Sequence, residues 1–207
     1  MSETELYMPF ADPVIKYNDL NLDNKTILKD IKKVKFKPTT KSEGTYISQN
    51  LNIFSDLKEN SFIKDTFIIR IKHALIQFGY ASDIKIGNCW ATLTKPKSRS
   101  HFHLHSNYWL SACYYPMGSV KDGFAIKFKR PSPLIFDVPK KNFSSFNSVE
   151  FKLNIKEGDF IVFPSYLEHQ IDDNKTKYNR YSLAMVINPM GIIGSDDSLI
   201  DYSVFNK

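Results

Sequence analysis

The chain has 207 residues, of which 42% are hydrophobic and 14% aromatic, so it is long and apolar enough for one domain with a buried core. No apolar run approaches the roughly 18 residues that span a bilayer, so we expect no membrane partner. Lys and Arg outnumber Asp and Glu by 28 to 22, which gives a net charge of +6. These charges are spread along the chain, which favours a solvated lysine surface over a nucleic-acid site, although nucleic acid stays open as a partner.

Cysteine usage indicates a reducing compartment. Cys89 and Cys113 lie in hydrophobic, strand-like runs, and no secretory apolar segment begins the chain. We therefore expect buried thiols in a cytoplasmic protein. The oligomeric state is left open, with a homodimer as one possibility.

The N-terminal part of the chain is predicted to hold short extended segments and one short helix. Residues 8–10 and 14–15 form the extended start. Asp23 or Asn24 can then cap a short helix that Pro38 must end.

The clearest helix begins at Asn60 or Ser61. Gly79 stands where a C-terminal cap belongs, and His73 lies on the polar side of the helix. The apolar side chains recur at helical spacing, which predicts that this helix packs on a flat surface. These side chains are Ile63, Phe67, Ile71, Ala74, Leu75 and Phe78.

Beyond this helix the pattern changes to short strand-like segments separated by Gly, Pro, Asn and Asp. Helices first and strands afterwards favour a mainly β (α+β) fold, a double-stranded β-helix or jelly roll with helices on one side. We expect one domain, with the N-terminal strand and supporting helices at 1–83, the jelly-roll core at 84–190 and a C-terminal tail at 191–207. Residues 131–148 are predicted to form a long surface loop. The predicted strands are 84–94, the histidine-rich part of 100–116, 123–128, 149–153, 159–163 and 181–187.

Three of the five histidines stand at alternate positions, in the stretch SHFHLHSNYWLSACYYP. In an extended strand, alternate side chains point to one face, so His101, His103 and His105 would present two or three imidazoles to one point in space. This spacing is typical of metal ligands. The alternative is a polar strand whose histidines line a solvated edge.

A further histidine must complete such a metal site, and His73 and His169 remain. The polar helix position of His73 predicts an exposed side chain. His169 closes the segment GDFIVFPSYLEH, in which a strand ends at Pro164 and a loop carries the histidine at its rim. Eleven positions later, Arg180 stands at the start of the next strand. Its side chain could bind a carboxylate inside the core, close to a metal but not on it.

These motifs, in this order, resemble those of the iron(II)- and 2-oxoglutarate-dependent oxygenases. The sequence has HxH, then a single His 64 residues after His105, then RxS eleven residues further on. The resemblance is closest to an oxygenase branch of bacteria and their phages. There, a Trp-containing strand precedes HxH, matched here by CWA, a segment like SGVYY follows it, matched by SACYY, and FPSWLxH is matched by FPSYLEH. The likeness covers residues 90–189 well and the N-terminal part more weakly.

The resemblance implies a dioxygenase that uses Fe(II), 2-oxoglutarate and dioxygen, and that hydroxylates an unidentified substrate with release of succinate and CO2. His103, His105 and His169 would be the metal ligands. Ser111, at the start of SACYY, follows His105 by six residues, which is the offset that the resemblance implies for the second histidine of HxH. His103 and His105 are therefore preferred as the HxH pair, and His101 lies outside the ligand set. Arg180 and Ser182 would bind the far carboxylate of 2-oxoglutarate.

One ligand departs from the usual pattern. The facial triad of these enzymes is two histidines and a carboxylate, but His105 stands at the carboxylate position. Three neutral imidazoles leave the iron as a dication, where the usual triad leaves a monocation. Glu168 is a poor substitute, because neighbouring residues of extended chain point to opposite sides.

Four further residues have both a functional and a structural interpretation. Tyr115 could offer its hydroxyl to the cosubstrate carboxylate or be an aromatic core residue, and Ser182 could bond only to backbone. Asn107 and Trp109 could line the substrate mouth or form a turn and a packed ring.

The prime substrate stays open among protein side chains, nucleotides and small metabolites. The alternative function is a non-catalytic, metal-binding jelly-roll module for interactions. Arg180 discriminates between the two functions, because a structural three-histidine site needs no carboxylate clamp.

Overall fold

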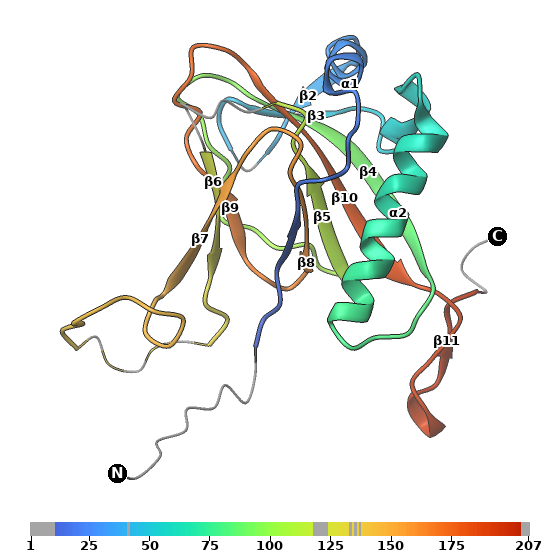
Figure 1. Cartoon of the computed structure of the whole chain (residues 1–207), viewed down its shortest axis with the longest axis vertical. Coiled ribbons are helices and arrows are strands. Elements are labelled where there is room, and N and C mark those ends of the chain that lie inside the picture. Colours follow the sequence, from blue (N-terminus) through green and yellow to red (C-terminus); the bar gives the residue numbers. More distant parts are fainter. Residues whose placement is uncertain are drawn as a thin grey trace.

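Two antiparallel sheets lie face to face in the computed structural model, which describes residues 11–40, 42–117, 124–132, 134, 136 and 138–203 (Figure 1). The expected extended start at residues 8–10 lies outside the described residues. No helix of the described part is long and apolar enough to cross a membrane. The arrangement of two packed antiparallel sheets with helices on one side confirms the predicted jelly roll.

The large sheet has seven strands in the order β1-β8-β5-β10-β4-β3-β2. The small sheet has three strands, in the order β7-β6-β9. A separate hairpin, β11 and β12, follows the jelly roll. The strands of the large sheet are β1 (Ile15–Tyr17), β2 (Phe36–Pro38), β3 (Thr45–Ser48), β4 (Ile84–Thr94), β5 (Leu110–Tyr114), β8 (Phe160–Pro164) and β10 (Arg180–Pro189). The remaining strands are β6 (Phe124–Lys129), β7 (Glu150–Ile155), β9 (His169–Ile171), β11 (Ile192–Ile193) and β12 (Ile200–Asp201).

The first helix, α1 (Asn24–Ile31), begins at the predicted cap. The Asp23 carboxylate accepts hydrogen bonds from the backbone N–H groups of Lys25 and Thr26, at 3.1 and 3.2 Å. The prediction that Pro38 ends this helix is wrong. The helix ends at Ile31, because after the cap residue Lys32 the N–H groups of Lys33 and Val34 donate to carbonyls three residues earlier. Pro38 lies in the edge strand β2.

The long helix α2 (Asn60–Gln77) covers the outer face of the large sheet (Figure 1). As predicted, Gly79 follows it with a φ of +82°, which suits glycine. Phe67 stacks on Phe160 of β8, with ring centroids 4.8 Å apart. His73 is exposed on this helix, as predicted, and its Nδ1 lies 2.8 Å from the Tyr17 hydroxyl.

The large sheet is buried on both faces. In one cross-strand row Leu183, Tyr114 and Phe160 face the helices, and in the next row Ala184, Cys113 and Ile161 face the small sheet. Strands buried on both sides read as continuous apolar runs, which explains the segment FIVFP of β8. Two short 3-10 helices, η1 (Ile53–Asp56) and η2 (Asp196–Ser198), lie outside the sheets.

Most predicted strands match the structure within a few residues, and β4 matches its prediction at both ends. The histidine-rich stretch differs, because residues 101–109 form an irregular connection with an isolated bridge at His103 and a turn at 106–107, and regular pairing begins only at Leu110. Strands β2 and β3 and helix η1 were not predicted. Between residues 131 and 148 the described residues form no helix or strand, as expected of a surface loop.

Candidate metal centre

The backbone brings His103 beside His169 although they are 66 positions apart in the sequence. The N–H of His103 donates to the carbonyl of His169 at 3.0 Å, and the N–H of His169 donates back at 2.8 Å. Such a doubly bonded antiparallel pair directs both side chains to the same side. His105, two residues further on, is held by a hydrogen bond from its N–H to the Ser165 carbonyl at 3.1 Å, so its side chain joins that side.

The three imidazoles converge. One ring nitrogen of each of His103, His105 and His169 lies within 4.8 Å of the other two. The ring centroids of His103 and His169 are 4.4 Å apart, and His105 lies 5.1 and 5.3 Å from them. This spacing lets a single metal ion contact all three rings.

Hydrogen bonds decide which nitrogen faces the metal. Nδ1 of His103 lies 2.9 Å from the His101 carbonyl, and Nδ1 of His169 lies 2.9 Å from the Leu167 carbonyl. A carbonyl only accepts, so each Nδ1 carries the proton and each Nε2 keeps its lone pair. Such backbone bonds orient metal-binding histidines in proteins.

Burial keeps the His169 ring neutral. Burial, aided by the nearby imidazole of His103, lowers the pKa of His169 to about 3. Neutral imidazole is the form that binds a metal, so this histidine needs no deprotonation at neutral pH.

The metal-free protein should therefore lose stability in mild acid. The unfolded histidine binds a proton below about pH 6.5, whereas folded His169 stays neutral down to about 3, so the unfolded state binds more protons in this window. We expect this group to lower the free energy of unfolding by up to about 1.4 kcal/mol for each pH unit below 6.5. Urea unfolding in a chelator at pH 7, 6 and 5 measures this slope. A His169→Gln variant should show a shallower decline, and parallel profiles for the two proteins would contradict the assignment.

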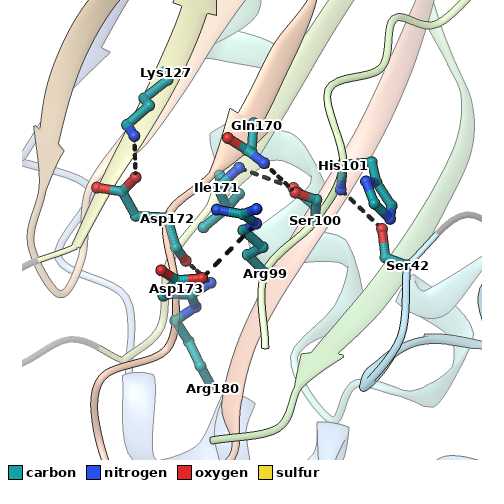
Figure 2. A network of polar contacts seen from close by, with 10 residues as sticks. All are labelled: Ser42, Arg99, Ser100, His101, Lys127, Gln170, Ile171, Asp172, Asp173 and Arg180. Atoms are coloured by element: carbon teal, nitrogen blue, oxygen red, sulfur yellow. Dashed lines mark hydrogen bonds and ion pairs between the residues drawn. The ribbon is translucent and has the colours of Figure 1, made fainter. Parts of the chain in front are cut away.

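No carboxylate of the described residues joins the three histidines. Glu168 turns away and pairs with Lys129 at 3.0 Å. His101 is exposed, and its backbone N–H donates to Ser42 Oγ at 2.8 Å, so it also lies outside the cluster (Figure 2). The donor set is three imidazole nitrogens, which suits divalent iron, nickel, copper or zinc and leaves further coordination positions for other ligands.

The histidines border a cavity of about 530 Å³ between the two sheets. Its floor is the inner face of the large sheet, where Arg180 lies opposite Thr94 and Ser182 lies opposite Thr92. The cross-strand row of Ser182 and Thr92 continues through Ile47 of β3 to Lys37 of β2. The small sheet supplies the other wall, through Ile126, Ile171 and His169.

Arg180 is a buried cation that lines this cavity. It is 8% exposed, its Nη2 donates to the Asp172 carbonyl at 2.9 Å, and its guanidinium lies 4.5 Å from the centre of the Phe124 ring. Burial lowers the pKa of Arg180 to about 10, so it remains charged at neutral pH. The carboxylates of Asp172 and Asp173 pair with other cations instead. Arg180 thus has no counter-ion in the part of the chain that the structure describes, and a buried charge in that state costs several kcal/mol, which favours an anionic ligand here.

Tyr115 carries a second buried polar group to which a ligand could bind. Its side chain is 1% exposed, and its hydroxyl is the one buried side-chain polar atom of the described residues without a hydrogen-bond partner. Burial raises its pKa, so the hydroxyl keeps its proton. Buried polar groups are almost always paired, so a ligand oxygen would complete this one. Ser182 is bonded to the hydroxyl of Thr92, a side-chain contact rather than the backbone contact considered above.

Other residues of the cavity were not predicted as part of the site. Trp90 places its ring edge against His105, with centroids 5.6 Å apart, and the alternation of Trp90, Thr92 and Thr94 in β4 was the available sequence signal. For Asn107 and Trp109 the structural interpretation fits. Asn107 has a φ of +70° in an exposed turn, and Trp109 packs on Tyr80 outside the cavity.

Comparison with known proteins agrees with this geometry. Residues 88–185 match the family described as "Putative 2OG-Fe(II) oxygenase". The chain carries a 2OG-Fe(II) oxygenase domain. It is therefore an enzyme, a dioxygenase that depends on Fe(II), 2-oxoglutarate and dioxygen, as the motifs predicted.

Solved structures share the fold of this oxygenase at low sequence identity. HygX from Streptomyces hygroscopicus, with nickel, 2-oxoglutarate and hygromycin B bound, is 10% identical over 86% of this chain and 83% of its own, with a TM-score of 0.60. A Pseudomonas putida prolyl-4-hydroxylase is 15% identical over 87% and 94%, with a TM-score of 0.57. A Trichoplax adhaerens prolyl hydroxylase in complex with a hypoxia inducible factor peptide is 11% identical over 84% and 83%, with a TM-score of 0.57. No curated protein sequence matches the chain.

Proposed function

We propose that the oxygenase binds Fe(II) through Nε2 of His103 and His169 and a ring nitrogen of His105, and that Arg180 binds the far carboxylate of 2-oxoglutarate. The observation that carries this proposal is one cavity that holds both three converging imidazoles and a buried guanidinium that forms no ion pair with any described carboxylate. When bound, the iron and 2-oxoglutarate together activate dioxygen, with release of succinate and CO2. The oxygenase thereby hydroxylates its prime substrate.

Each residue around the cosubstrate has a separate role in binding it. Arg180 supplies the charge and a planar pair of donors that fit a carboxylate, and Tyr115 adds the hydroxyl that otherwise has no partner. Ser182, fixed by Thr92, borders the same carboxylate. Phe163, whose ring packs edge-on against His169 at 4.8 Å, keeps water away from the buried ligand.

Charge balance is consistent with this arrangement. Imidazoles that bind a metal are neutral, so the iron would keep both positive charges, and Arg180 adds a third. The 2-oxoglutarate dianion would offset two of these three charges. In the usual triad of two histidines and a carboxylate, the protein carboxylate offsets one more. We therefore expect the cosubstrate to bind far more tightly to the iron-loaded protein than to the metal-free protein.

The prime substrate is proposed to enter over strands β2 and β3. The cavity floor runs in that direction to Lys37, and an adjoining hollow of about 470 Å³ is lined by Thr40, Tyr46 and His101. Structural neighbours have a small molecule, hygromycin B, or a peptide bound. A substrate of either class fits this position. A nucleotide substrate, a second copy of the chain as partner and a cytoplasmic location stay predictions.

Succinate formation tests the proposed activity. The purified protein is incubated with Fe(II), ascorbate and isotopically labelled 2-oxoglutarate in air, and succinate is measured with time. Without prime substrate we expect slow succinate release that continues over many turnovers. Without iron or without oxygen we expect no succinate. A protein that binds iron and 2-oxoglutarate but never forms succinate, even with a broad metabolite and peptide extract as substrate source, would contradict the proposal.

A further inference from the structure

We propose that Asp172 is a positioning residue for 2-oxoglutarate, which fixes the direction of the Arg180 guanidinium from outside the cavity. This inference rests on the proposed function, in which Arg180 binds the far carboxylate. Asp172 does not line the cavity, so it acts through the arginine.

The main chain of Asp172 holds the arginine directly. Its carbonyl accepts the 2.9 Å hydrogen bond from Arg180 Nη2 (Figure 2). Arg180 begins β10 of the large sheet, whereas Asp172 directly follows β9 of the small sheet. The bond therefore spans the two sheets, and the direction of the guanidinium depends on where the small sheet places this carbonyl.

The side chain of Asp172 fixes that carbonyl. Its carboxylate lies 3.0 Å from Lys127 Nζ of β6 and 3.1 Å from Lys152 Nζ of β7, and its N–H donates to the Ala125 carbonyl at 2.9 Å. Burial alone would raise the pKa of Asp172, but the hydrogen bonds and charges of Lys127 and Lys152 lower it. The carboxylate is therefore ionised at neutral pH and bridges two neighbouring strands.

The opposite edge of β9 is held as well. Gln170 Nε2 donates to the Ser100 carbonyl at 2.7 Å, and the N–H of Ile171 donates to Ser100 Oγ at 2.8 Å (Figure 2). Four consecutive residues thus carry His169 at one end and the carbonyl that holds Arg180 at the other. Because β9 is fixed on both edges, the remaining freedom of that carbonyl is set by the Asp172 side chain.

Asp172→Asn tests the inference, since it removes the charge and keeps the size of the side chain. On protein loaded with redox-silent Ni(II), calorimetry should show 2-oxoglutarate affinity weakened by about 3- to 10-fold, because the guanidinium is less well preorganised. Nickel affinity should change by less than about twofold. Lys127→Gln should act in the same direction, and it decides the matter if Asp172→Asn fails to fold. Asp173→Asn is the matched control, because this neighbouring, half-exposed carboxylate lies 3.9 Å from Arg99 Nε and forms no ion pair with Arg180 or Lys127. It should therefore weaken the affinity clearly less than Asp172→Asn does.

A double-mutant cycle separates positioning from general structural damage. In an Arg180→Ala background, Asp172→Asn should cause no further loss of 2-oxoglutarate affinity. Wild-type affinity in both Asp172→Asn and Lys127→Gln would overturn the inference, as would an equal loss in the Arg180→Ala background. Wild-type affinity in Arg180→Ala alone would instead refute the carboxylate clamp on which the inference rests.

Discussion

Arg180→Ala should weaken 2-oxoglutarate binding by roughly 30- to several-thousand-fold. Truncation leaves the far carboxylate of the cosubstrate in a buried position without its cation, at a cost of about 2–5 kcal/mol. Each 1.4 kcal/mol corresponds to about a tenfold change in affinity. Iron affinity should be nearly unchanged, because the guanidinium bonds to the Asp172 carbonyl and lies outside the cluster of three imidazoles.

Arg180→Lys is the matched variant for the same measurement. It keeps the charge, but a point charge cannot reproduce the planar two-pronged donor, so it should recover only part of the loss. The measurement is calorimetric titration of 2-oxoglutarate into metal-loaded wild type and both variants. If the alanine variant binds as tightly as wild type, Arg180 is a structural residue and the proposed clamp is wrong.

Alanine at His103, His105 or His169 should abolish iron binding in each case. The three rings converge on one point, and two imidazoles without a carboxylate are a weak site for Fe(II). His101→Ala is the control, because this exposed histidine meets Ser42 only through its backbone N–H, which alanine retains. His101→Ala should therefore keep the iron.

Iron content after anaerobic loading and desalting gives the result for all four variants. Circular dichroism and thermal unfolding show whether each variant is folded, which matters most for the buried His169. An equal loss of iron in His101→Ala and in the other three would refute the ligand set. Retention of iron in folded His105→Ala would instead point to a site of two histidines.

Sequence was sufficient for the parts of the site that depend on local spacing. Short-range patterns include the alternation of His103 and His105 and the strand and loop that lead to His169. The helical spacing of α2 and the glycine at position 79 are patterns of the same kind. The interpretation of these motifs as an oxygenase then followed from their order along the chain. The family match over residues 88–185 confirmed it.

Contacts between distant segments could not be predicted in this way. The His103–His169 bridge replaces the regular strand that the alternating histidines suggested, because Ser100 and His103 pair with β9 only at single points. The edge strand β2 and its neighbour β3 are three and four residues long, too short for a periodic pattern. Asp172 gave no sequence signal, since its carbonyl and side chain act through Arg180 and Lys127, which lie on other strands.

The three-histidine ligand set has a chemical consequence for the cosubstrate. No carboxylate of the described residues would reach a metal bound by the three histidines, so 2-oxoglutarate would be its first anionic ligand, and the far carboxylate would bind the buried Arg180 guanidinium. Binding of metal and cosubstrate should therefore be strongly cooperative, each raising the affinity for the other by the same factor.

The central claim is that one cavity holds iron on three histidines and 2-oxoglutarate on Arg180, so that the cosubstrate chelates the metal. Anaerobic titration of 2-oxoglutarate into the Fe(II)-loaded protein, followed by visible absorption, tests this claim most directly. A metal-to-ligand charge-transfer band that grows to one equivalent of cosubstrate is expected, and it should be absent without iron and shifted to much higher 2-oxoglutarate concentration in Arg180→Ala. A protein that binds iron at the three histidines but develops no such band at any concentration of 2-oxoglutarate would contradict the claim.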